Sequence, residues 1–295
     1  MSAKLRRRAV LALPWLWTVL FFFLPLALVV KISLATSQLS VPPYSDFFAR
    51  TNGAVTGIRA NLDNYGLLFS DALYVKAYLS SVKIAAISTV LALLLGYPMA
   101  YGIAHAAPTR RPLLLVLVTL PFWTSFLVRI YAWMGILRPG GTINTALQAL
   151  GLIDEPLRLL NTPGAVYLGI VYAYLPFMVL PLYARLEKQD PALLEAAADL
   201  GARPWQAFLR VTLPLSLPGV LAGCLLVFIP AVGEFVIPEL MGGPDTLMIG
   251  RVLWNEFFTN HDWPLSAAVT VLLLIVLVVP VALFQTVQAR AEKRL

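Results

Sequence analysis

The chain has 295 residues, of which 59% are hydrophobic and 13% are charged, and its formal net charge is +7. Because an average soluble domain is about 25% charged, this composition excludes an ordinary soluble enzyme or nucleic-acid-binding domain. Two histidines and one cysteine exclude a Cys/His metal cluster and a disulfide framework. The sequence contains no G-x-x-x-x-G-K-[ST], so we expect no cofactor in this chain, and any ATP must be bound by a partner.

Long apolar segments dominate the chain. A helix needs about 20 apolar residues to cross a bilayer, so we predict an all-α, polytopic membrane protein that forms a single domain over residues 1–295. The first segment is longer than the apolar core of a signal peptide and shows no small-residue cleavage site, which favours a retained anchor. The six predicted membrane spans are Val10–Val30, Tyr78–Ile103, Leu113–Leu137, Ala165–Tyr183, Leu217–Pro238 and Leu265–Val287.

The basic residues orient these spans. If the N-terminus is cytoplasmic, the short inner segments hold most of the lysines and arginines, so the positive-inside rule places both termini in the cytoplasm. The outer segments, including a long loop from Pro42 to Asp71, carry more acids than bases. The inner basic residues are Lys4, Arg6, Arg7, Arg8, Arg110, Arg111, Arg185, Lys188, Arg203, Arg210, Arg290, Lys293 and Arg294.

A charged, alanine-rich stretch, EAAADLGARPWQAFLRVTLP, separates the fourth and fifth spans at residues 195–214. Asp190-Pro191 supplies a capping acceptor and a preset first helical residue, and good helix formers follow to Leu200. Gly201 can end that helix in a left-handed conformation, and Pro204 can begin a second one that reaches roughly to Val211. We therefore predict two short helices joined by a glycine turn on the cytoplasmic face.

This stretch resembles the EAA loop of ABC-importer permease subunits, which have the MetI-like fold. The resemblance implies that residues of about 187–214 form a coupling loop that docks on a cytoplasmic ATPase. It also implies a second homologous permease, a dimer of ATP-binding subunits that holds ATP and Mg, and an extracytoplasmic solute-binding protein, all at a bacterial inner membrane. The residues to which it assigns the coupling role are Glu195, Ala196, Ala197, Gly201, Arg203 and Pro214.

Three ionisable residues interrupt the apolar spans, namely Lys83, Arg129 and Glu234. A charge at membrane depth costs at least a few kcal/mol unless it is paired or hydrated, so each is a functional candidate. Arg129 and Glu234 either form a structural ion pair or line the translocation path. In the second case Glu234 would accept a substrate ammonium group, because Pro230 and Pro238 break the span around it.

Aromatic residues near the same level could bind an alkylammonium through cation–π contacts, or could lie at the membrane interface as Trp and Tyr generally do. The candidates for the substrate path are therefore Glu234, Arg129, Trp123, Tyr131, Trp254 and Asp245.

Two further stretches, Leu120–Leu137 and Pro230–Phe258, look like the polyamine (putrescine/spermidine) branch of these permeases. We therefore expect an importer subunit for a small cationic solute that contacts membrane lipid and no nucleic acid. Three alternatives remain: a permease for another small solute, a stand-alone channel or secondary carrier, and a membrane-embedded hydrolase. The hydrolase lacks support because neither His105 nor His261 lies in a nucleophile–base motif.

Overall fold

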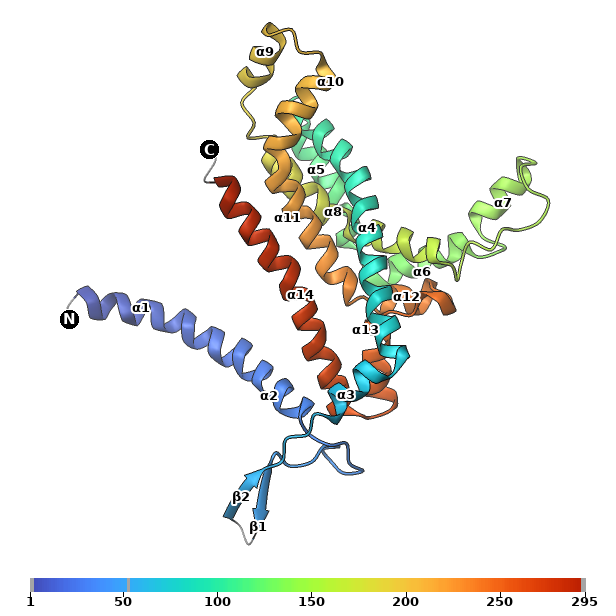
Figure 1. The fold of residues 1–295 in the computed structure, drawn as a ribbon. Coiled ribbons are helices and arrows are strands. Elements are labelled where there is room, and N and C mark those ends of the chain that lie inside the picture. The colour runs from blue at the N-terminus through green and yellow to red at the C-terminus, as the bar shows by residue number, and fades with distance from the viewer. Residues whose placement is uncertain (1–2, 52–53, 293–295) are drawn as a thin grey trace. The chain divides into compact units, whose positions relative to one another are not determined.

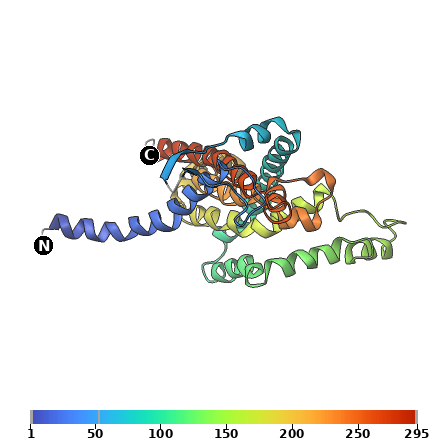
Figure 2. The same cartoon turned by 90° about the horizontal axis from the view of Figure 1, so that it is seen from below.

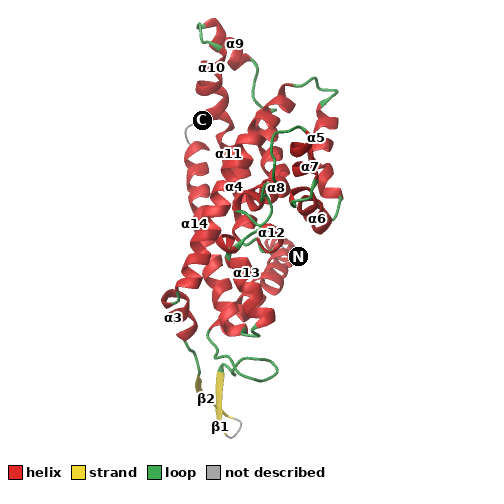
Figure 3. Cartoon of the chain, turned by 90° about the vertical axis from the view of Figure 1, so that its right-hand side faces the viewer, coloured by secondary structure: helices red, strands yellow, loops and turns green. Residues whose placement is uncertain are grey.

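The computed structural model describes residues 3–51 and 54–292, and this part of the chain is mainly helical (Figure 1). Lys293 and Arg294 of the basic C-terminus lie outside the described residues. The expected helical membrane fold is confirmed, with one addition. Two strands form an antiparallel hairpin in the predicted long loop, where Val55, Thr56 and Ile58 favour extended structure (Figure 3).

Helices make up most of the described chain, and the strands lie between the second and third of them. The helices are α1 (Ala3–Thr18), α2 (Leu24–Ser33), α3 (Asp63–Ser70), α4 (Ala72–His105), α5 (Arg111–Thr119), α6 (Phe126–Leu137), α7 (Thr142–Ala149), α8 (Pro163–Leu186), α9 (Ala192–Asp199), α10 (Pro204–Ala207), α11 (Leu213–Val232), α12 (Val236–Met241), α13 (Ile249–Trp254) and α14 (Trp263–Glu292). The strands are β1 (Phe48–Thr51) and β2 (Ala54–Ile58). Short π-helical turns cover Val19–Phe23, Phe208–Thr212 and Asn255–Thr259, and 3₁₀ turns cover Leu120–Trp123 and Pro244–Thr246.

The chain divides into two compact units, each with its own contacts. Unit 1 comprises Met1–Val75 and Val252–Leu277, and unit 2 comprises Lys76–Arg251 and Val278–Leu295. The coupling loop, Arg129 and Glu234 all belong to unit 2, whereas Trp254 belongs to unit 1.

Five helical stretches in the described residues are long and apolar enough to cross a membrane, and a sixth span requires a bent pair of helices. The five are Leu11–Ser33, Ala72–His105, Pro163–Leu186, Pro204–Val232 and Trp263–Ala282.

The predicted third span, Leu113–Leu137, is wrong as a single straight helix. Arg111–Trp123 and Phe126–Ala149 meet at 89°, and the green ribbon of α6 and α7 runs away from α5 (Figure 2). Thr124 and Ser125 are extended at the bend, and the Thr124 hydroxyl donates to the carbonyl of Pro121 at 2.9 Å. This side-chain bond satisfies a helix-end carbonyl and lets the backbone change direction.

The predicted fifth span, Leu217–Pro238, is wrong at both ends. Helical structure begins at Pro204 and continues through Pro214 to Val232, so the second short helix of the loop merges with the span. The π turn Phe208–Thr212 widens the helix just before Pro214, whose ring would otherwise clash with the carbonyl one turn earlier. At the other end the helix stops at Gly233, and α12 is a separate helix.

The packing of unit 2 centres on Met178 of α8, which is fully buried. A Cβ atom at Gly223 of α11 would lie 2.7 Å from the Met178 sulfur, and one at Gly96 of α4 would lie 2.8 Å from its Cγ. Only glycine lets the backbones of α4 and α11 approach Met178 this closely, so this contact fixes three helices together.

Candidate functional site

The loop between α8 and α11 forms the first part of the candidate site. Figure 1 shows α9 and α10 together at one end of α8 and α11, with α12 at the other end. The Asp190 carboxylate accepts a hydrogen bond from the backbone N–H of Ala192 at 3.0 Å, as the Asp-Pro pair predicts. Two short helices joined at Gly201 are therefore confirmed, although the second one continues into α11.

Gly201 makes the turn between these helices. Its φ angle is +81°, a conformation that glycine adopts without the steric cost of a Cβ atom. The Gly201 N–H donates to Ala198 O at 2.8 Å, and the Ala202 N–H donates to Ala197 O at 3.0 Å. These two bonds form a Schellman motif, so the sharp end of α9 depends on the glycine.

The beginning of α10 is fixed by its own side chains. The Arg203 N–H donates to the Gln206 side-chain oxygen at 2.9 Å, and Pro204 occupies the first helical position. A backbone N–H at this position would have no hydrogen-bond partner within the helix, and proline has no N–H to leave unpaired. The chain thus enters α10, and hence α11, in a defined direction.

Side-chain bonds attach the loop to the ends of the spans. Arg185 Nε donates to Leu215 O at 2.9 Å, and Gln189 Nε2 donates to Thr212 O at 3.1 Å. Glu187 also pairs with Arg111 of α5 at 3.4 Å, although exposed ion pairs of this kind contribute at most about 1 kcal/mol. A force applied to α9 and α10 would therefore act directly on α8 and α11.

Exposed apolar side chains surround the turn. Leu200 is 89% exposed, and Leu193 and Trp205 are also exposed. The Glu195 side chain is exposed and makes no hydrogen bond or ion pair with the described residues. A mixed apolar and acidic surface of this kind is suited to contact with another protein. Ala196, Gly201, Arg203 and Pro214 are also exposed, and Ala197 is half-buried.

The second part of the site is the carboxylate of Glu234, in the break between α11 and α12. Glu234 is only 8% exposed. Oε1 accepts the backbone N–H groups of Phe235 at 3.1 Å and Val236 at 3.0 Å, and Oε2 accepts the Tyr174 hydroxyl at 2.5 Å. Neutral donors thus satisfy the carboxylate, and it caps α12 at the same time.

No ion pair joins Arg129 to Glu234 among the described residues. The Arg129 guanidinium lies 5.3 Å from the centre of the Phe122 ring and 5.8 Å from that of Phe126. Its Nε and Nη1 atoms are occluded and have no hydrogen-bond partner in the described part of the chain. Neither Arg129 nor Glu234 therefore forms an ion pair with another residue in the described part of the chain.

The other predicted path residues of unit 2 are exposed, and Trp254 belongs to unit 1. Trp123 and Tyr131 are 77% and 57% exposed, and Asp245 is exposed as well. Trp254 packs on Phe258 in unit 1, with ring centres 4.2 Å apart. Lys83 is exposed on α4.

Sequence reasoning missed Tyr174. This residue lies sixty positions before Glu234, on another helix, and is embedded in an apolar run that gives no signal of a polar role. Pairing of the fourth and fifth spans places it there, which only the tertiary structure reveals.

Comparisons with known proteins agree with these features. The profile of the family described as "Binding-protein-dependent transport system inner membrane component" matches residues 8–294. The chain is 41% identical over 289 residues to the spermidine/putrescine transport system permease protein PotB of Haemophilus influenzae, covering 98% of this chain and 95% of the relative. It is 44% identical over 261 residues to PotB of Escherichia coli, covering 88% and 90%.

A solved structure extends the likeness to the fold. A chain of a bacterial ABC transporter involved in the import of the acidic polysaccharide alginate superposes with a TM-score of 0.71. The match covers 97% of each chain at 18% sequence identity, so it bears on the fold alone.

Proposed function

The chain belongs to the family of binding-protein-dependent transport system inner membrane components, and we propose that it is the membrane-spanning subunit of an ATP-driven importer of polyamines such as putrescine or spermidine. The observation that supports the transport role is the helix–glycine turn–helix loop, which is hydrogen-bonded to the ends of two spans. The PotB relatives, which match nearly the whole chain, support the polyamine as substrate.

The coupling loop is the proposed docking site for a dimer of ATP-binding subunits, which hold the ATP and Mg. The exposed apolar residues around Gly201 contact a groove on that dimer, and Glu195 and Arg203 contribute charged contacts. Arg185 and Gln189 then transmit the closing movement to α8 and α11. This chain performs no covalent chemistry, and transport follows from a difference in contacts between two states.

The remaining partners and the orientation follow the same proposal. A second homologous permease completes the translocation path, and an extracytoplasmic solute-binding protein delivers the solute. Both termini and the coupling loop face the cytoplasm, since the basic residues are concentrated there.

For the substrate we propose that Glu234 accepts an ammonium group. A carboxylate has about four lone-pair sites, and Tyr174 occupies one of the two on Oε2. A substrate cation would supply the missing opposite charge, and a hydrogen bond between charged groups contributes about 1.5–3 kcal/mol. Trp123, Tyr131, Trp254 and Asp245 are the further candidates for the path.

Uptake by reconstituted vesicles tests the transport role. Radiolabelled spermidine should accumulate only when this chain, its sister permease, the ATP-binding subunits and the binding protein are all present with ATP. Gradient-driven uptake that persists without the ATP-binding subunits would instead identify a stand-alone carrier.

The substitution Glu234→Gln tests the cation site. It should lower the apparent affinity for spermidine at least about tenfold, which corresponds to about 1.4 kcal/mol. Glu239→Gln is the matched control, because it removes a nearby acid that is exposed and already paired with Arg251. Unchanged affinity in a well-folded Glu234→Gln variant would refute the role of Glu234.

A second candidate solute is an anion, favoured by the unpaired nitrogen atoms of Arg129. An oxyanion could accept hydrogen bonds from Nε and Nη1. Uptake assays separate the two candidates: accumulation of spermidine that excess putrescine abolishes would support the cation, whereas ATP-dependent accumulation of molybdate without spermidine uptake would favour the anion.

A further inference from the structure

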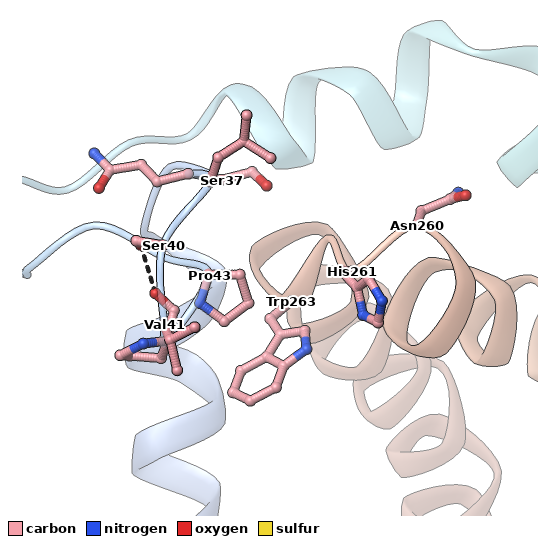
Figure 4. Close-up of a pocket in the computed structure, with 10 residues that line it drawn as sticks. Ser37, Ser40, Val41, Pro43, Asn260, His261 and Trp263 are labelled. Atoms are coloured by element: carbon pink, nitrogen blue, oxygen red, sulfur yellow. Dashed lines mark hydrogen bonds between the residues drawn. The ribbon is translucent and has the colours of Figure 1, made fainter.

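Unit 1 contains a pocket that the transport role does not use. A loop of residues 37–43 lines it on one side, and Asn260, His261 and Trp263 line it on the other; it is open to solvent and has a volume of about 730 Å³ (Figure 4). The Ser45 N–H donates to Thr36 O at 3.0 Å and closes the base of the loop. Figure 4 shows Trp263 lying between Pro43 and His261.

A second, apolar pocket of about 330 Å³ adjoins the first, because Trp263 lines both. Val29 and Ile32 of α2 form one wall, and residues of α13, the following π turn and α14 form the other. Its hydroxyl groups are already bonded: Thr270 Oγ1 donates to Ser266 O at 2.9 Å, and Ser266 Oγ lies 3.5 Å from Leu253 O. The second pocket therefore offers a ligand almost nothing but apolar surface.

The first pocket holds more polar groups than the second, although apolar surface dominates both. The second pocket lies along the candidate spans Leu11–Ser33 and Trp263–Ala282, which are long and apolar enough to cross a membrane. The first pocket lies beyond the ends of these spans. There the His261 ring and the Gln38 side-chain amide make no hydrogen bond with other described residues, whereas the Asn260 side chain donates to Glu256 at 2.8 Å.

We propose that these two pockets form a binding site for one phospholipid. An acyl chain occupies the apolar pocket between α2 and α14, since water is excluded from an apolar cavity and hydrocarbon fills it. The headgroup lies in the first pocket, within reach of His261 and Gln38. Trp263 stands at the junction, the position that indole rings prefer between hydrocarbon and headgroups. Two adjoining, mainly apolar pockets with polar groups concentrated in one of them match an amphiphile better than a protein segment.

The test uses the full-length chain in vesicles of phosphatidylethanolamine and phosphatidylglycerol whose acyl chains are brominated close to the ester group, at the level of Trp263. Bromine quenches the fluorescence of an indole that it touches. The part of the quenching that is lost in Trp263→Phe reports on this site, since the other tryptophans are unchanged. We expect Val29→Phe, which fills the apolar pocket, to abolish the quenching that depends on Trp263. Mass spectrometry of the purified chain should then detect one tightly bound phospholipid fewer than in the unsubstituted chain.

Val30→Phe is the matched control, because Val30 is the next residue of α2 and lines neither pocket. It should leave both the quenching and the retained phospholipid unchanged. Equal lipid retention in Val29→Phe and Val30→Phe would overturn the proposal. If, in addition, Leu39→Ser weakened binding of the solute-binding protein, the first pocket would belong to that partner; Leu39 is fully exposed at its rim.

Discussion

The Tyr174 hydroxyl donates a hydrogen bond of 2.5 Å to Oε2 of Glu234 and thereby ties α8 to the break between α11 and α12. Burying a carboxylate that is only 8% exposed is costly unless hydrogen-bond donors contact it. The same carboxylate caps α12 through two backbone N–H groups. One side chain thus fixes the direction in which the chain leaves the fifth span.

Removing this hydroxyl should destabilise unit 2. Tyr174→Phe leaves one carboxylate oxygen without its protein donor, which we expect to cost about 1–3 kcal/mol and to lower the unfolding temperature of the purified chain. Tyr172→Phe is the control, because Tyr172 lies on the same helix and contacts Trp133 through its ring. Equal unfolding temperatures for the two variants would show that the bond contributes nothing.

Substitution at Gly201 should impair coupling to the ATP-binding subunits. Gly201→Val forces a β-branched residue to a φ angle of +81°, at a cost of about 1–3 kcal/mol, and distorts the end of α9. ATP hydrolysis stimulated by the loaded binding protein should fall in the reconstituted complex.

The chain offers a matched control for this substitution. Gly151 follows α7 with a φ angle of +66° and makes the same bonding pattern, from its own N–H to Gln148 O and from Leu152 N to Leu147 O. Gly151→Val should introduce similar strain without touching the coupling loop. Equal losses of stimulated hydrolysis in the two variants would argue against a special role of residue 201.

The exposed leucine before each of these glycines gives a test that leaves the backbone intact. Leu200 is 89% exposed and Leu150 is 73% exposed, so an aspartate at either position should change stability by less than about 0.5 kcal/mol. Leu200→Asp should nevertheless release the ATP-binding subunits in pull-down assays, because it places a charge in the proposed apolar contact. Leu150→Asp should retain them, and a complex that survives Leu200→Asp would place docking elsewhere.

The close contact of α8 and α11 should tolerate no side chain at Gly223. A Cβ atom there would lie 2.7 Å from the Met178 sulfur and 3.1 Å from the Met178 carbonyl oxygen. Gly223→Val should therefore cost about 1–3 kcal/mol through overpacking, seen as a lower unfolding temperature. Gly102→Val, on α4 with nothing within 4 Å of the added Cβ, should cost less; the reverse order would contradict the packing.

Much of this protein follows from the order of its residues. The length of the apolar runs predicts the spans, because each helix must satisfy its own backbone in hydrocarbon. The sequence around Gly201 predicts the turn of the coupling loop, since capping acceptors, prolines and a glycine act locally. These signals depend on neighbours within a few positions, so no tertiary contact is needed to read them.

Only the tertiary structure decided the rest. The 89° bend after Trp123 and the end of the fifth span at Gly233 lie within apolar runs that hydropathy reads as continuous. The donor to Glu234 comes from a helix sixty residues away, and Arg129 faces phenylalanine rings instead of an acid. Helix packing determines which polar groups meet at membrane depth, and packing depends on shapes that distant segments present to one another.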